Sequence, residues 1–285
     1  MEGILHKKEI RDQGLMGTLF WTGAPKSAVI VLGGSSGGLP ESRAEALAAE
    51  GYYALALAYF GVGHLPQRLS QIPLEYFEAA LTFLSNFVDQ VGLWGISRGA
   101  ELSLILGTLF PERIDALAAH VPSSVVYGTL DGTSLPAWVY RGEQVAPSAP
   151  FALHATAAGD SMESAIATTP SFLASMADPT AFASSAIPVE KLQCPLLLVS
   201  AEDDQMWPST LFAKQIIERL QTFRSPLEVS HIVYPKVGHS PGRGGAGMHP
   251  VWKRWFAYGG SPAENAAAAV DWLQQTVSFF KARLD

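Results

Sequence analysis

The sequence predicts an α/β fold in which helices cover both faces of a mostly parallel sheet. Short apolar segments alternate with segments of helical periodicity along the chain, and glycine-rich loops follow two of the apolar segments. The chain has 285 residues, of which 48% are hydrophobic and 16% charged, so it can form one large core. We therefore expect a single domain over residues 1–285.

The expected elements follow one another in order. The first core strand is 28–32, whose unbroken run Ala-Val-Ile-Val-Leu is typical of a strand buried on both faces. A helix over 41–50 and a strand over 53–58 come next. The remaining expected strands are 91–94, 116–121, 196–200 and a segment ending near 233–234, and the remaining helices are 74–84, 100–106, 209–220 and 262–282.

Residues 122–188 interrupt this alternation. The segment is rich in Pro, Ser, Thr and Ala and has no clear periodicity. Long irregular segments in a regular fold often carry function, so we expect an irregular lid or substrate-binding insert here. A solvated surface excursion is the alternative interpretation.

The sequence Gly-Ile-Ser-Arg-Gly at 95–99 lies between the strand over 91–94 and a helix. The pattern G-x-S-x-G in this context indicates a nucleophile elbow, in which flanking glycines permit a strained backbone at the serine. Ser97 would then point its hydroxyl into an active site. This context predicts the α/β-hydrolase fold.

A serine nucleophile needs a base and an acid that orients the base. In α/β-hydrolases these follow in the order Ser, Asp or Glu, His, each on a loop after a strand. Asp204 follows the strand over 196–200 and has Pro208 four positions on, a spacing seen in many hydrolases, which favours Asp204 over Asp203. His239 follows the next strand and is the expected base.

The oxyanion of a tetrahedral intermediate needs two backbone donors. We expect one from the N–H of Arg98 and the other from the glycine-rich loop 33–38, at Ser35 or Ser36. Gly34 in the same loop is a candidate substrate contact. The loop fits neither G-x-G-x-x-G nor G-x-x-x-x-G-K-[ST], which disfavours a nucleotide site.

Composition excludes several other functions. The net charge of −7 disfavours a nucleic-acid partner. Cys194 is the only cysteine, and the histidines lack metal-binding spacing, so we expect no intrachain disulfide, no metal and no cofactor. The first residues have no apolar targeting segment, and no run is long enough to span a bilayer. We expect a cytoplasmic protein without a membrane partner, and the sequence leaves its oligomeric state open.

Eight segments carry a wider resemblance, and they are 14–20, 32–41, 57–60, 74–77, 92–104, 187–190, 202–207 and 234–239. In order and spacing they resemble the C-terminal catalytic domain of the acyl-CoA thioesterase and bile acid-CoA:amino acid N-acyltransferase family, which is dienelactone-hydrolase-like. The resemblance also implies a strand within 14–20. Mammalian-type relatives carry a separate N-terminal β-sandwich domain, and we expect it to be absent here because only about 25 residues precede the first core strand.

The resemblance places the family's catalytic Ser, Asp and His on Ser97, Asp204 and His239. It implies cleavage of an acyl thioester of the acyl-CoA type through a covalent acyl-enzyme. Relatives that transfer the acyl group to an amino acid carry cysteine as the nucleophile, so the serine favours water as acceptor. Two alternatives stay open: transfer to an amine or alcohol, and a dienelactone-hydrolase-like carboxylesterase or lactonase activity.

Coenzyme A is polyanionic, so a protein of net charge −7 that binds it needs cations near the cleft mouth. The candidates are Arg68, Arg98, Arg243, Lys253 and Arg254. Of these, Arg243 is the expected substrate contact, since it closely follows His239. A solvated surface cation is the alternative interpretation for each.

Overall fold

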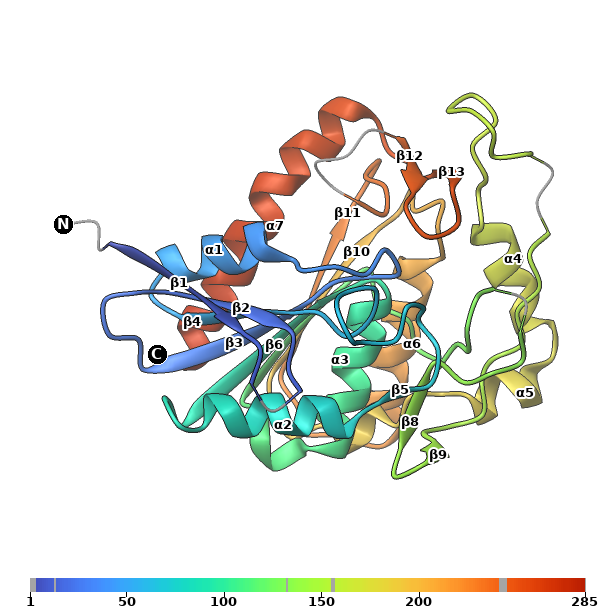
Figure 1. Ribbon diagram of the computed structural model, residues 1–285. Helices are drawn as coiled ribbons and strands as arrows, with labels where there is room; N and C mark the ends of the chain where they lie inside the picture. Colours follow the sequence, from blue (N-terminus) through green and yellow to red (C-terminus); the bar gives the residue numbers. More distant parts are fainter. Residues whose placement is uncertain (1–3, 13, 132, 155–156, 241–244, 285) are drawn as a thin grey trace.

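An eight-stranded sheet forms the centre of the protein in the computed structural model, which describes residues 4–12, 14–131, 133–154, 157–240 and 245–284 (Figure 1). Across the sheet the strands are β1 (Leu5–Ile10), β2 (Gly17–Thr22), β4 (Tyr53–Leu57), β3 (Ser27–Leu32), β6 (Gln90–Ile96), β7 (Ala116–His120), β10 (Leu196–Ala201) and β11 (Val229–Tyr234). The β1–β2 and β2–β4 pairs are antiparallel, and the other neighbours are parallel. The predicted mostly parallel sheet is confirmed.

Helices cover both faces of this sheet (Figure 1). One face carries α1 (Glu41–Ala49) and α7 (Pro262–Leu284), and the other carries α2 (Glu75–Leu84), α3 (Arg98–Leu109) and α6 (Ser209–Thr222). Alternate residues of β3 point to opposite faces of the sheet. Val29 and Val31 pack with α1 and α7, whereas Ile30 packs with α2, α3 and α6. This double burial explains why β3 is apolar from residue 28 to residue 32.

The N-terminal edge of the sheet differs from the expectation from residue patterns. β2 was implied only by the family resemblance, and β1 was not expected at all. All residues of β1 except Ile10 are exposed, and Lys7, Lys8 and Glu9 lie within it. An exposed, charged edge strand has no buried face to impose an apolar pattern, so periodicity does not reveal it.

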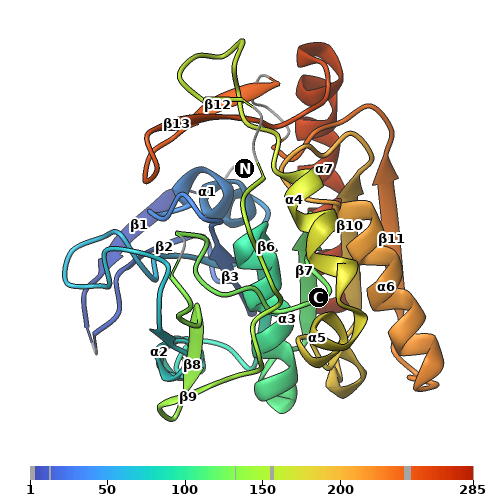
Figure 2. The same ribbon diagram turned by 90° about the vertical axis from the view of Figure 1, so that its right-hand side faces the viewer.

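The insert at 122–188 contains more regular structure than predicted. Its strands β8 (Trp138–Tyr140) and β9 (Glu143–Gln144) form a small sheet with β5 (Ile72–Pro73), and its helices are α4 (Thr169–Ala174) and α5 (Pro179–Ser184). Each helix has six residues, too few for a helical period to show. A local signal was present for α5, because Asp178 caps the helix and Pro179 occupies its first turn. Figure 2 shows the insert on the side that faces the viewer.

A second unexpected element is the hairpin of β12 (Ala246–His249) and β13 (Arg254–Ala257), which precedes α7. Its first strand reads Ala-Gly-Met-His, which shows no polar–apolar alternation. The hairpin lies near the insert in both views (Figures 1 and 2). No helix in the part of the chain that the structure describes is long and apolar enough to cross a membrane.

Candidate active site

The turn between β6 and α3 has the geometry of a nucleophile elbow. Ser97 has a φ of 59° and a ψ of −123°, a backbone conformation that residues other than glycine rarely adopt. Any Cβ on Gly95 would overlap the backbone of Gly99, and any Cβ on Gly99 would overlap the carbonyl oxygen of Gly33. Both flanking positions therefore require glycine, as the motif predicts.

The structure brings Ser97, His239 and Asp204 into one hydrogen-bonded chain. The Oγ of Ser97 lies 2.8 Å from Nε2 of His239, and Nδ1 of His239 lies 2.9 and 3.0 Å from the two carboxylate oxygens of Asp204. His239 and Asp204 are 4% and 6% exposed, whereas Ser97 is partly exposed. Asp204 accepts a hydrogen bond from Nδ1–H of His239, so Nε2 carries no hydrogen and can accept a hydrogen bond from the Ser97 hydroxyl.

Neighbouring backbone groups fix the acid and the base. The Oδ1 atom of Asp204 also accepts from the N–H groups of Met206, at 3.0 Å, and Trp207, at 3.2 Å. The N–H of His239 donates to the carbonyl of Tyr258 at 2.7 Å. Asp203 instead accepts from the N–H of Gly260 at 2.7 Å. Of the two adjacent aspartates, only Asp204 contacts His239.

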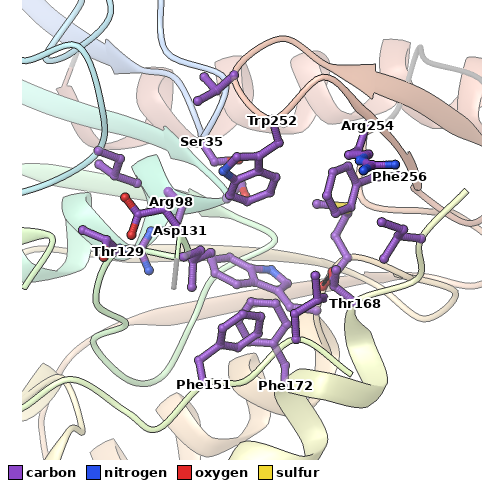
Figure 3. Close-up of a pocket in the computed structure, with 18 of the residues that line it drawn as sticks. Ser35, Arg98, Thr129, Asp131, Phe151, Thr168, Phe172, Trp252, Arg254 and Phe256 are labelled. Carbon is purple, nitrogen blue, oxygen red and sulfur yellow. Dashed lines mark hydrogen bonds between the residues drawn. The ribbon is translucent and has the colours of Figure 1, made fainter. Parts of the chain in front are cut away.

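Ser97 and His239 open into a cavity of about 720 Å³ (Figure 3). Aromatic side chains from distant segments line it: Phe151 and Phe172 from the insert, Trp207 from the loop before α6, and Trp252 and Phe256 from the hairpin. The insert also contributes Thr129, Leu130, Asp131, Leu153, Ala157, Ala158, Ile166 and Thr168. The insert thus forms a wall of the cavity. Sequence reasoning did not identify these aromatic residues, because only the fold brings them together.

The two backbone segments that are expected to supply the oxyanion donors both adjoin Ser97. Arg98 is the first residue of α3, so its N–H has no acceptor within the helix. On the facing loop, a Cβ on Gly34 would lie 3.1 Å from Cβ and 3.6 Å from Oγ of Ser97. Ser35 lines the cavity, whereas Ser36 is not among the lining residues.

The side chain of Arg98 is not a cation at the cleft mouth, which corrects one expectation. Its guanidinium is 1% exposed, pairs with Glu101 at 2.8 Å, and donates to the carbonyls of Tyr127 and Gly128. Glu101 also accepts from Nε1 of Trp138 at 2.7 Å and from the N–H of Tyr127 at 3.2 Å. Burial raises the pKa of Glu101, and the guanidinium and the N–H donors oppose this effect. This buried network ties the first turn of α3 to the insert.

Two of the other expected cations are on the cavity wall. The side chains of Arg68 and Arg254 are 72% and 51% exposed and pair with Asp131 and Asp160, respectively. Lys253 is exposed on the hairpin turn but is not among the lining residues. Arg243 lies outside the described residues.

The described ranges contain no group of three or more His, Cys, Asp or Glu side chains placed to hold a metal ion.

Comparison with known proteins gives relatives that match almost the whole of the chain. Acyl-coenzyme A thioesterase 2, mitochondrial, of Mus musculus is 29% identical over 96% of this chain and 60% of that protein. Acyl-coenzyme A thioesterase 1 of Homo sapiens is 30% identical over 98% of this chain and 66% of that protein. The chain thus spans less than two thirds of the length of these relatives.

A solved esterase of Pyrococcus furiosus shares the fold, with a TM-score of 0.55, 17% identity, and coverage of 99% of this chain and 94% of that one. The α/β-hydrolase fold predicted from the elbow is thereby confirmed. The family described as "BAAT / Acyl-CoA thioester hydrolase C terminal" matches residues 72–285. The chain therefore belongs to the BAAT and acyl-CoA thioester hydrolase C-terminal family, the family that its motifs resemble.

Proposed function

We propose that the protein is a serine hydrolase that cleaves acyl thioesters of the acyl-CoA type through an acyl-enzyme on Ser97. The observation that carries the proposal is the hydrogen-bonded chain from Ser97 through His239 to Asp204, which opens into an aromatic cavity. Membership of the thioester hydrolase family supports the same substrate class.

The first half of the reaction acylates the serine. His239 Nε2 takes the proton of the Ser97 hydroxyl as Oγ attacks the thioester carbonyl carbon, and Asp204 stabilises the imidazolium. The carbonyl oxygen becomes an oxyanion beside the N–H of Arg98 and the loop that carries Ser35. Collapse of this intermediate breaks the carbon–sulfur bond, and the thiol leaves with the proton from His239.

The second half returns the serine. Water attacks the acyl carbonyl while His239 Nε2 takes its proton, and the free acid leaves as Ser97 recovers its hydrogen. In the first half the leaving group is a thiol, and in the second half it is the Ser97 oxygen; in both, His239 supplies the proton that the leaving group needs. Serine as the nucleophile supports water as the acceptor, which is the expectation from the sequence.

The cavity suits a substrate with one apolar end and one anionic end. Phe151 and Phe172, whose ring centroids lie 4.6 Å apart, form an apolar wall together with Trp207 that would take the acyl chain. Arg68 and Arg254 are exposed on other parts of the wall and would attract the phosphates of coenzyme A (Figure 3 shows Arg254).

A panel of acyl-CoAs of increasing chain length, run beside p-nitrophenyl esters, tests the proposal. Thiol release and the acyl product are measured with and without glycine or taurine as an acceptor, for the wild type and Ser97→Ala. We expect faster turnover of acyl-CoA than of the oxygen esters, free acid as the product, and no turnover by Ser97→Ala. If the main product is acylated glycine or taurine, the reaction is acyl transfer and not hydrolysis. If the p-nitrophenyl esters turn over faster than the acyl-CoAs, the preferred substrate is an oxygen ester and not a thioester.

A further inference from the structure

A second serine–histidine hydrogen bond borders the same cavity. Nε2 of His249, the last residue of β12, lies 3.1 Å from Oγ of Ser35 on the loop after β3. The two residues are 214 positions apart, so the hairpin brings this histidine to the loop. The mechanism above uses neither of these side chains.

Backbone contacts decide which nitrogen of His249 carries the hydrogen. Nδ1 lies 3.3 Å from the N–H nitrogen of Val251 and 3.4 Å from that of Trp252, and both groups donate to it. A nitrogen that accepts carries no hydrogen, so the neutral ring has its hydrogen on Nε2. Nε2–H therefore donates to Ser35 Oγ, and the hydroxyl hydrogen of Ser35 is left to donate elsewhere.

The His249 ring is held in place by packing. It is 2% exposed, stacks on Trp252 with centroids 4.2 Å apart, and meets Phe256 edge-on at 5.8 Å. The N–H of Lys253 donates to the His249 carbonyl at 2.9 Å and closes the turn. Figure 3 shows Trp252 beside Ser35. Such packing preorganises the hydrogen bond to Ser35 before substrate arrives.

Ser35 belongs to the loop that faces the Ser97 side chain. It lines the cavity together with Ser97, and the preceding residue, Gly34, is so close that an added Cβ would lie 3.6 Å from Ser97 Oγ. The oxyanion develops between Ser97, the first N–H of α3 and this loop. A hydroxyl at Ser35 that has already accepted one hydrogen bond can direct its own hydrogen at that oxygen.

We propose that Ser35 is a further catalytic residue, whose hydroxyl donates to the oxyanion, and that His249 is a positioning residue, which holds this hydroxyl by donating to its oxygen. The proposal rests on the acyl transfer to Ser97 proposed above. No proton is transferred between His249 and Ser35. In the other pair, by contrast, His239 accepts the proton of the Ser97 hydroxyl.

The test compares Ser35→Ala and His249→Phe with the wild type in two assays: acyl-CoA hydrolysis, and the rate at which a fluorophosphonate modifies Ser97. Oxyanion donors act in the transition state, so we expect each variant to lower kcat and the modification rate about 100-fold, with KM changed less than about threefold. His249→Gln, which retains an N–H donor, should recover most of the rate. Melting temperatures show which variants fold.

His231→Phe is the matched control. It removes another serine–histidine hydrogen bond, 2.9 Å long, between His231 and Ser200, and neither residue lines the cavity. We expect wild-type rates in both assays.

The double variant Ser35→Ala/His249→Phe decides between positioning and mere packing. If His249 acts through the Ser35 hydroxyl, the double variant loses no more than the larger single loss. The proposal is overturned if the rate loss of the double variant equals the product of the two single losses. It is also overturned if the Ser35→Ala variant folds and keeps the wild-type rates. If the wild type hydrolyses no acyl-CoA but its fluorophosphonate reaction follows the predicted pattern, the thioesterase proposal fails and this one stands.

Discussion

Replacing Asp204 by asparagine should invert the hydrogen bonding of the base without changing the size of the side chain. Oδ1 of Asp204 accepts from the N–H groups of Met206 and Trp207, so the amide oxygen of an asparagine would take this place. Its NH2 group would then replace Oδ2, which lies 2.9 Å from Nδ1 of His239. The oxygen at the Oδ1 position, 3.0 Å from Nδ1, already accepts from two N–H groups, so we expect Nδ1 to accept from the NH2 group and the ring hydrogen to move to Nε2. Nε2 can then no longer take the proton of Ser97.

The expected loss is about 10⁴-fold in kcat, or about 5 kcal/mol of transition-state stabilisation, the size found when a triad aspartate is replaced in this way. Asp203→Asn is the neighbouring control, since Asp203 contacts Gly260 and not His239. We expect it to stay within about threefold of the wild type, as a change outside the reacting groups. The assay is thiol release from an acyl-CoA, with melting temperatures measured alongside. The reasoning is refuted if folded Asp204→Asn keeps more than a tenth of the wild-type kcat, or if Asp203→Asn costs more.

Three further predictions concern the surroundings of the triad. Glu101→Gln should lower the free energy of unfolding, measured by urea denaturation, by about 3 kcal/mol, because it leaves the buried guanidinium of Arg98 without its counter-ion. The double variant Arg98→Met/Glu101→Gln should lose less of this free energy, and an equal or larger loss would contradict the ion-pair explanation. Gly34→Ala places a Cβ 3.1 Å from Cβ of Ser97, so the loop must shift, and we expect kcat to fall about tenfold with an unchanged melting temperature; an unchanged kcat would show that the loop does not border the reacting atoms. The double variant Arg68→Glu/Arg254→Glu should raise KM about tenfold for acyl-CoA but not for an acyl-N-acetylcysteamine thioester, which lacks the phosphates. Equal increases in KM for both substrates would show that these arginines do not bind coenzyme A.

The parts of the fold that sequence predicts are those governed by local patterns. The elbow at Ser97 needs glycines at fixed positions, so its geometry is visible in five residues. Asp204 and His239 follow from the chain order of the fold, because the carboxyl ends of neighbouring parallel strands meet at one edge of the sheet. The core strand β3 is apparent because it is buried on both faces.

Other parts of the site depend on contacts between distant segments. His249 reaches Ser35 only because the hairpin folds over the loop after β3, and nothing in the sequence of the hairpin predicts that approach. The aromatic residues that line the cavity likewise come from the insert, the loop before α6 and the hairpin. Arg98 was expected at the cleft mouth, and its spacing of three residues from Glu101 on one helix was the available signal for a buried pair.

Trapping the acyl-enzyme tests the role of Ser97 most directly. The protein is mixed with an acyl-CoA, quenched with acid within the first turnovers, and analysed by intact-mass and peptide mass spectrometry. We predict an added mass equal to the acyl group, located on the peptide that contains Ser97, transient in the wild type and absent from Ser97→Ala. An acyl adduct on another residue, or thiol release by Ser97→Ala at the wild-type rate, would contradict the covalent mechanism.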